Sequence, residues 1–173
     1  MCIRDRSEGT VGSLGLSEWG YGIEADLRYH LRVQNPFVRS RRVRYFTPQE
    51  ANALLPEIAA QLDELVLCVQ RYEEVIVALR AGGARDEQRL AVEADVLRRE
   101  SQEILDDITD RGVEVKGIAQ KLLGFPALRN GQEAYLCWRQ GDDRVEWWHP
   151  LNTGASARER VDYENLGIWE WCN

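Results

Sequence analysis

The fold is decided by the stretch TPQEANALLPEIAAQLDELVLCVQRYEEVIVALRA, residues 47–81. It opens on Thr47, which is followed directly by a proline and, three residues on, by a glutamate. This order is typical of a capping box with proline at the first helical position. It predicts a helix that runs to Ala81. Pro56 is expected to interrupt or kink it, because proline lacks the N–H that a helix interior uses.

Apolar residues along this helix recur at alternating steps of four and three, the spacing of a seam that faces a partner helix. The same alternation returns after Gly82-Gly83 and continues to Arg111-Gly112. Because the connection is short, the helices are expected to be antiparallel neighbours in a coiled-coil-like hairpin. The two seams consist of Ile58, Leu62, Leu65, Val69, Tyr72, Ile76 and Leu79, then Leu90, Ala94, Leu97, Ser101, Ile104 and Ile108.

Residues 65–69 are apolar around the whole circumference of the first helix. A two-helix seam cannot bury all of them, so a second surface is expected to cover the remaining face. That surface is either a sheet or a second copy of the chain. The sequence therefore leaves open a homo-oligomer formed through the hairpin.

Short strands follow the second helix. Residues 113–116 alternate between valine and a charged residue, and Glu133–Arg139 and Val145–His149 flank a turn-rich connection. These patterns predict an antiparallel sheet, with 122–126 as a loop. The predicted fold class is α+β, a long antiparallel helical hairpin packed with a small antiparallel β-sheet.

The register of the two longer strands is predicted from their side chains. A connection of even length gives an apolar face and a mixed face, whereas an odd length would mix them. We prefer the even length, which pairs Arg139 with Glu146 and lays the apolar face on the helices. The apolar face would hold Leu136, Trp138, Val145, Trp147 and His149, and the mixed face Tyr135, Cys137, Arg139, Glu146 and Trp148.

The mixed face is the predicted contact surface. Trp148 and Tyr135 would form an aromatic patch there, able to stack a planar ligand or grip a peptide, although tryptophans in adjoining strands more often build a core. The loop before Arg158 resembles an anion-binding turn, which ordinary turn chemistry explains equally well. The candidate ligand- or partner-binding residues are Tyr135, Arg139, Glu146, Trp148 and Arg158.

Two residues are candidates for catalysis. His149 could act as a general base, because the unperturbed pKa of a histidine side chain lies near neutral pH. Cys137 could act as a nucleophile if Arg139 lowered the pKa of its thiol. A half-buried histidine bonded to backbone and a buried thiol are the simpler interpretations, because no orienting acid accompanies them. No metal or cofactor is expected, since only Cys137 and scattered carboxylates could join His149 as ligands.

Net charge, apolar runs and cysteine spacing indicate which partners the protein binds and in which compartment it is expected. The chain has 22 basic and 29 acidic residues and a net charge of -7, which disfavours binding to nucleic acid. It has neither an apolar run of roughly 20 residues, as a membrane span needs, nor a secretory leader. Its four cysteines are far apart, which favours reduced thiols over a disulfide scaffold. We therefore expect a cytoplasmic protein.

The first 42 residues show no sustained helical or strand periodicity. Their opening, Met1 to Arg6, resembles a translated sequencing-adaptor fragment, and Val43 is a candidate alternative start. A genuine short helix or strand at 17–33 is the competing interpretation. We thus predict a poorly ordered or artefactual leader at 1–42, a single α+β domain at 43–162 and a C-terminal appendage at 163–173.

Several motifs, in this order, resemble the DUF2203 family of small bacterial proteins over about residues 43–162. The family usually has Gly-Leu-Val-Asp before its Phe-Pro step, whereas this chain has Leu122-Leu123-Gly124. Because the resemblance implies no established activity, it implies no catalytic residues. The matching motifs are Arg44 to Pro56, Gly124 to Ala127, Tyr135 to Arg139, and Trp148-His149 with Gly154 downstream.

Two functional hypotheses follow. The first is a non-enzymatic interaction or ligand-binding module that uses the mixed face of the sheet. The alternative is a small hydrolase or transferase in which His149 acts as acid or base near Cys137 and Arg158. The alternative requires a concave pocket on which those three side chains converge.

Overall fold

The computed structural model describes residues 43–82, 86–151, 153, 157–164, 166 and 170–171. The predicted leader at 1–42 lies outside these residues. The described part holds a helical hairpin followed by a five-stranded sheet, in which each strand is antiparallel to the next in the order β1-β2-β3-β4-β5. The elements are α2 (Pro48–Ala81), α3 (Glu87–Asp110), β1 (Glu114–Gly117), β2 (Leu122–Arg129), β3 (Gln132–Arg139), β4 (Trp147–Pro150) and β5 (Glu159–Arg160).

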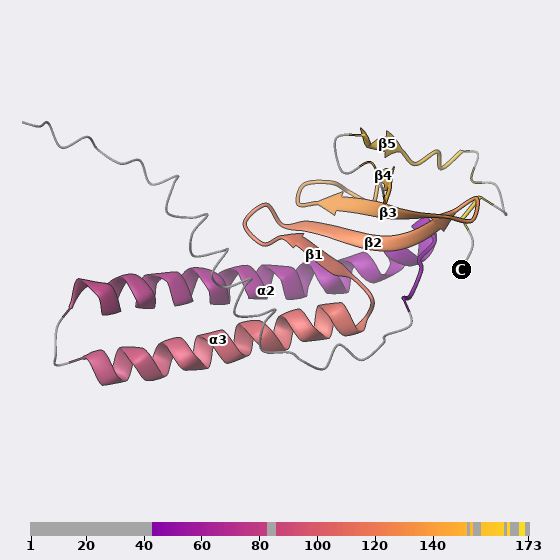
Figure 1. Ribbon diagram of the computed structural model, residues 1–173. Coiled ribbons are helices and arrows are strands. Elements are labelled where there is room, and N and C mark those ends of the chain that lie inside the picture. Colours follow the sequence, from indigo (N-terminus) through magenta and orange to yellow (C-terminus); the bar gives the residue numbers. More distant parts are fainter. Residues whose placement is uncertain are drawn as a thin grey trace, which may run out of the picture. The chain divides into compact units, whose positions relative to one another are not determined.

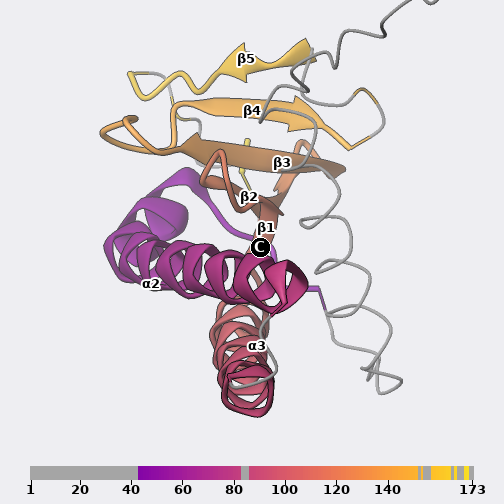
Figure 2. The ribbon, with the colours of Figure 1, turned by 90° about the vertical axis from the view of Figure 1, so that its left-hand side faces the viewer.

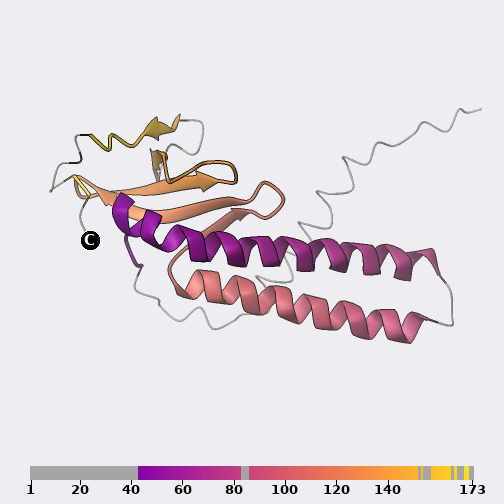
Figure 3. The same ribbon diagram turned by 180° about the vertical axis from the view of Figure 1, so that it is seen from behind.

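The sheet and the two helices are stacked. The sheet lies over the N-terminal part of α2, and α2 lies between the sheet and α3 (Figures 1 and 2). The ends of α2 and α3 that meet near residue 82 extend beyond the sheet, as Figure 3 shows from behind. The predicted α+β class and the packing of a helical hairpin with an antiparallel sheet are confirmed.

Helix α2 begins as its sequence predicts. Thr47 Oγ1 accepts a hydrogen bond from the Glu50 N–H at 3.2 Å, and the Glu50 carboxylate accepts one from the Thr47 N–H at 2.8 Å. Of the interruption or kink predicted at Pro56, the interruption is wrong, because the helix is continuous to Ala81, whereas the kink stays a prediction. Pro56 lies on the exposed side, where water can replace the hydrogen bond that the Asn52 carbonyl loses.

The hairpin packs along the predicted seams. Ile58, Leu62 and Leu65 of α2 are fully buried, as are Ser101 and Ile108 of α3. The second face of α2 is covered only in part, because Val66 is buried whereas Leu67 is 66% exposed. A second copy packed on that face stays a prediction.

The core lies between α2 and the inner face of the sheet. Leu123, Phe125 and Leu136 are fully buried on that face. The Phe125 ring meets that of Phe46, which precedes α2, edge to face at 5.5 Å between centroids. An edge-to-face aromatic pair of this kind stabilises a core beyond its buried area.

The Asn52 carboxamide joins α2 to the sheet. Its Oδ1 accepts a hydrogen bond from the Val145 N–H at 2.8 Å, and its Nδ2 donates one to the Tyr163 hydroxyl at 2.7 Å. The Tyr163 hydroxyl in turn donates to the Val145 carbonyl. Both backbone groups of Val145 are therefore bonded outside the β3–β4 ladder.

The register of β3 and β4 differs from the prediction by one residue. Tyr135 pairs with His149 and Leu136 with Trp148. Since β3 ends at Arg139 and β4 begins at Trp147, seven residues (140–146) connect them, an odd number. The bonds of Val145 to Asn52 and Tyr163 keep it out of the strand, which the side-chain pattern alone does not reveal.

Three expectations that depended on this register are wrong. Arg139 and Glu146 are not cross-strand neighbours, because neither the pairing of β3 nor that of β4 includes such a pair. Tyr135 and Trp148 lie on opposite faces, so they form no common aromatic patch. Trp147 and His149 leave the predicted apolar face and join Tyr135 on the outer face.

The predicted loop at 122–126 is also wrong, because these residues form the first part of β2. The turn from β2 to β3 is the dipeptide Asn130-Gly131, with φ of 50° and 76°. Positive φ at both central residues is the geometry of a two-residue type I′ hairpin. Pro126 fits within β2 because its backbone faces the outer edge, where its carbonyl accepts from the Phe46 N–H at 2.8 Å.

Replacing Asn52 tests the tie between α2 and the sheet. We expect Asn52→Ala to lower the free energy of unfolding by about 2 kcal/mol, because the Val145 N–H loses its acceptor in a part-buried site. Urea unfolding followed by circular dichroism measures the change. The matched control is Gln70→Ala on the exposed side of the same helix, expected within about 0.5 kcal/mol of the wild type. Equal effects of the two substitutions would contradict the assignment.

Candidate functional site

The outer face of the sheet carries several of the predicted site residues. Register and strand alternation bring Tyr135, Cys137, Trp147 and His149 to the face opposite Leu136. The ring centroids of Tyr135 and His149 are 5.8 Å apart. The structure thus gathers both catalytic candidates with two of the binding candidates, Tyr135 and Arg158.

Tyr135 is held by a polar cluster from β1. Its hydroxyl donates to Glu114 Oε1 at 2.6 Å, and Lys116 Nζ lies 3.7 Å from its ring centroid while also pairing with Glu114. Gly124 makes room for this arrangement, since a Cβ there would lie 2.8 Å from Lys116 Cε. Burial, together with the hydrogen bond to Glu114, raises the pKa of Tyr135 above its usual value, so the hydroxyl remains a proton donor at neutral pH.

The environments of the two catalytic candidates fit a structural role. Cys137 is buried, and that burial raises the pKa of its thiol, although Arg158 and Lys116 act in the opposite direction. A protonated thiol is a poor nucleophile. His149 is 8% exposed, and its Nδ1 lies 2.9 Å from the Pro150 carbonyl oxygen. These contacts give the hydrolase or transferase hypothesis no support.

The remaining binding candidates are spread over the sheet. Arg139 is exposed at the far end of β3, and its N–H is bonded to the Asp142 carboxylate. Glu146 pairs with Arg160 at 3.3 Å, not with Arg139. The Arg158 guanidinium lies 5.6 Å from the Trp147 ring centroid on the outer face. The five predicted binding residues therefore do not form one surface.

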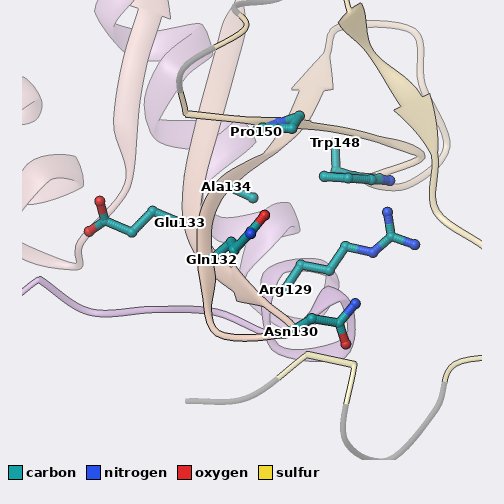
Figure 4. Close-up of a pocket in the computed structure, with 7 residues that line it drawn as sticks. All are labelled: Arg129, Asn130, Gln132, Glu133, Ala134, Trp148 and Pro150. Carbon is teal, nitrogen blue, oxygen red and sulfur yellow. The ribbon is translucent and has the colours of Figure 1, made fainter.

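Trp148 lies at a cavity beside the β2–β3 turn (Figure 4). The cavity has a volume of about 360 Å³. In Figure 4 the Arg129 side chain extends beneath the Trp148 indole, and the guanidinium carbon is 3.9 Å from the ring centroid. The Glu133 side chain points away from Arg129 and Trp148, and its carboxylate accepts from the Tyr45 hydroxyl at 2.6 Å. The lining residues are Arg129, Asn130, Gln132, Glu133, Ala134, Trp148 and Pro150.

Residues 170 and 171 also contact Arg129. The Glu170 carboxylate accepts from Arg129 Nε at 2.6 Å, and a second nitrogen of the guanidinium pairs with the same carboxylate. The Trp171 indole meets that of Trp148 edge to face at 5.8 Å. Part of the segment predicted as an appendage thus lies against β2.

Of the cavity residues, sequence reasoning identified only Trp148. Apart from Pro150 of β4, the others belong to the β2–β3 hairpin, and the prediction of a loop at 122–126 left the β2 strand of that hairpin unrecognised. The dipeptide Asn130-Gly131 is the signal that could have found them, because it is a strong marker of a two-residue hairpin turn.

Metal-ligand clusters and membrane-spanning helices are both absent from the described residues. No group of three or more metal-ligating side chains occurs within the residues that the structure describes. No helix in the same part of the chain has the length and apolar character needed to cross a membrane.

The fold and the site define a small α+β domain with a polar cavity at one end of an antiparallel sheet. The chain belongs to the family described as an uncharacterized conserved protein (DUF2203), whose family model matches residues 44–161. The resemblance predicted from the motifs is confirmed. Comparison with curated proteins and with solved structures gives no match.

The Tyr135 cluster is expected to make the free energy of unfolding decrease at alkaline pH. The folded pKa of Tyr135 is raised, so its contribution to stability is complete below the unfolded pKa of about 10 and falls as the pH rises above it. We expect the stability difference between wild type and Tyr135→Phe to be constant from about pH 7 to pH 9 and to shift against the wild type above about pH 10. Urea unfolding across this range measures it. A difference that stays constant up to pH 11 would refute the assignment.

Proposed function

We propose that this protein is a non-enzymatic binding module whose ligand occupies the cavity between the β2–β3 turn and Trp148. One observation carries the proposal, namely a cavity of about 360 Å³ that combines an indole with hydrogen-bonding side chains of several kinds. Ligand cavities have volumes of roughly 300 to 1,000 Å³ and pair an apolar wall with a few placed polar groups.

The polar groups around the cavity differ in what they can bind. Asn130 and Gln132 can both donate and accept, whereas Arg129 donates only. Arg129 is fixed in place by its contacts with Trp148 and Glu170. A small polar ligand would therefore meet prearranged partners, which lowers the entropic cost of binding.

The side chains that line the cavity favour binding over catalysis. They include no histidine, cysteine or hydroxyl group that could act as a nucleophile or as a base near neutral pH. His149, Cys137 and Arg158, the residues of the alternative hydrolase or transferase, do not line this cavity. No observation favours that alternative over the binding module.

The proposal extends to location and assembly. A cytoplasmic location is supported by Cys68 and Cys137, which are both free thiols and would persist in a reducing compartment. Self-association through the hairpin is supported by the exposure of Leu67 and Val92, at 66% and 60%. Size-exclusion chromatography with light scattering tests it, and a monomer at high concentration would exclude it.

Blocking the cavity tests the binding function. Gln132 is exposed at the rim, so Gln132→Trp should fill the entrance without disturbing the core. Gln140→Trp places the same bulk at an exposed position beyond the other end of β3 and serves as the matched control. The probes are succinate, 1,4-diaminobutane and the dipeptide glycyl-glutamate, which present a dicarboxylate, a diamine and a zwitterion.

We expect at least one probe to raise the melting temperature of the wild type and of Gln140→Trp by several degrees at saturating concentration. A hundredfold excess of ligand over Kd stabilises a protein by about 2.7 kcal/mol. The shift should be absent in Gln132→Trp. The binding function is contradicted if no probe shifts the wild type or if Gln132→Trp responds equally.

A further inference from the structure

The outer edge of β2 is only partly covered by β1. The β1 pairing extends from Leu122 to Gly124, which leaves the second half of β2 without a β1 neighbour. Unpaired backbone groups on a strand edge can pair with an added strand. Within this half the Pro126 carbonyl already accepts from the Phe46 N–H, so the end of the edge at residues 128–130 is the part to which an extended segment can be added.

Residues 170 and 171 make such an addition. The Asn130 N–H donates to the Glu170 carbonyl at 2.8 Å, and Arg129 and Trp171 form an antiparallel β-bridge. The chain therefore uses this end of the β2 edge for residues that lie some 40 positions further along the sequence.

The side chains of the added pair are also recognised. The Arg129 guanidinium binds the Glu170 carboxylate through two nitrogens, a strong and directional contact for arginine. The same guanidinium lies 3.9 Å from the Trp148 centroid and 5.7 Å from the Trp171 centroid. Trp171 is only 7% exposed. This end of the edge thus binds a carboxylate side chain that is followed directly by an indole side chain.

The binding groups lie inside the part of the sequence that the family model matches, whereas the bound pair, Glu170-Trp171, lies outside it. Arg129, Asn130 and Trp148 lie within the matched residues 44–161, whereas Glu170 and Trp171 lie beyond them. The occupant also leaves a cavity of about 360 Å³ open beside Arg129 and Trp148. The receiving groups are therefore part of the family domain, and the present occupant fills only part of the space next to them.

We propose that the end of the outer edge of β2 at residues 128–130, with Arg129 and Trp148, is a docking site for an extended segment of another protein in which an acidic residue directly precedes an aromatic residue. Binding is by β-strand addition, with the backbone of the segment pairing at Asn130 and its two side chains meeting Arg129 and Trp148. Glu170-Trp171 occupies the site in cis. This inference goes beyond the small-ligand proposal and does not depend on it.

Occupation in cis has a measurable consequence. A tethered segment competes with a free peptide at an effective concentration that reaches millimolar values for short linkers. A peptide in trans should therefore bind weakly to the wild type and more tightly once the tethered pair is removed. Loss of the tethered carboxylate alone should have a smaller effect in the same direction.

The experiment uses the full chain and a fluorescent six-residue peptide with the chain's own sequence 168–173, in which serine replaces the cysteine. Fluorescence anisotropy compares the wild type with the double variant Glu170→Ala/Trp171→Ala. We expect at least a tenfold lower Kd for the double variant. A control peptide with glutamine and alanine in place of the Glu-Trp pair should bind at least tenfold more weakly to that variant.

Two single variants keep the test decisive if the double variant does not fold. Glu170→Gln preserves the size of the side chain and removes its charge, so it should lower the Kd about threefold, since a charge-assisted hydrogen bond contributes roughly twice as much as a neutral one. Glu164→Gln removes another exposed carboxylate and should leave the Kd unchanged.

Three results would overturn the proposal. The first is equal affinity of the peptide for the wild type and Glu170→Gln. The second is equal affinity of the two peptides for the double variant. The third is a wild-type dimer, seen by light scattering, that the peptide converts to monomers, because the occupant would then belong to a second copy of the chain.

Discussion

The hydrogen bonds of the Asn52 carboxamide are the constraint on which the rest of the structure depends. The carboxamide accepts from the N–H of Val145 and donates to the Tyr163 hydroxyl. That hydroxyl in turn donates to the Val145 carbonyl. Val145 is thereby fixed against α2, and β4 begins only at Trp147. Because side chains alternate along a strand, this single choice of starting residue decides which of the following side chains face the helices and which face outward.

The two faces of the sheet acquire separate roles from this register. His149 faces outward beside Tyr135, where the Glu114 and Lys116 cluster holds the tyrosine as a proton donor. Trp148 faces inward and supplies the indole on which the Arg129 guanidinium lies. The pairing of a buried indole with a guanidinium at the end of the sheet produces a directional polar site next to a cavity. The binding function that we propose is therefore a consequence of the way in which the sheet is docked on α2.

The sequence predicts the parts of this structure that depend on local signals. The capping box at Thr47 and the alternating apolar steps identify the helical hairpin, because both patterns act within a few residues. The strand register could not be predicted, since Asn52 sets it from a position 93 residues before Val145. Strand β2 was hidden by its Gly-Phe-Pro sequence, although Asn130-Gly131 marks its turn. At the site, Trp148 was predicted for its aromatic surface, whereas Arg129 is distinguished only by partners that the fold brings to it from residues 148, 170 and 171.

The most direct test of this account is a nuclear magnetic resonance measurement of the Arg129 side chain in the full chain. Protons held close to the face of an indole experience a strong ring current. The account predicts upfield-shifted Arg129 side-chain resonances, with nuclear Overhauser contacts to the Trp148 indole and between the Trp148 and Trp171 indoles. Arg129 resonances at random-coil positions, without contacts to Trp148, would contradict it.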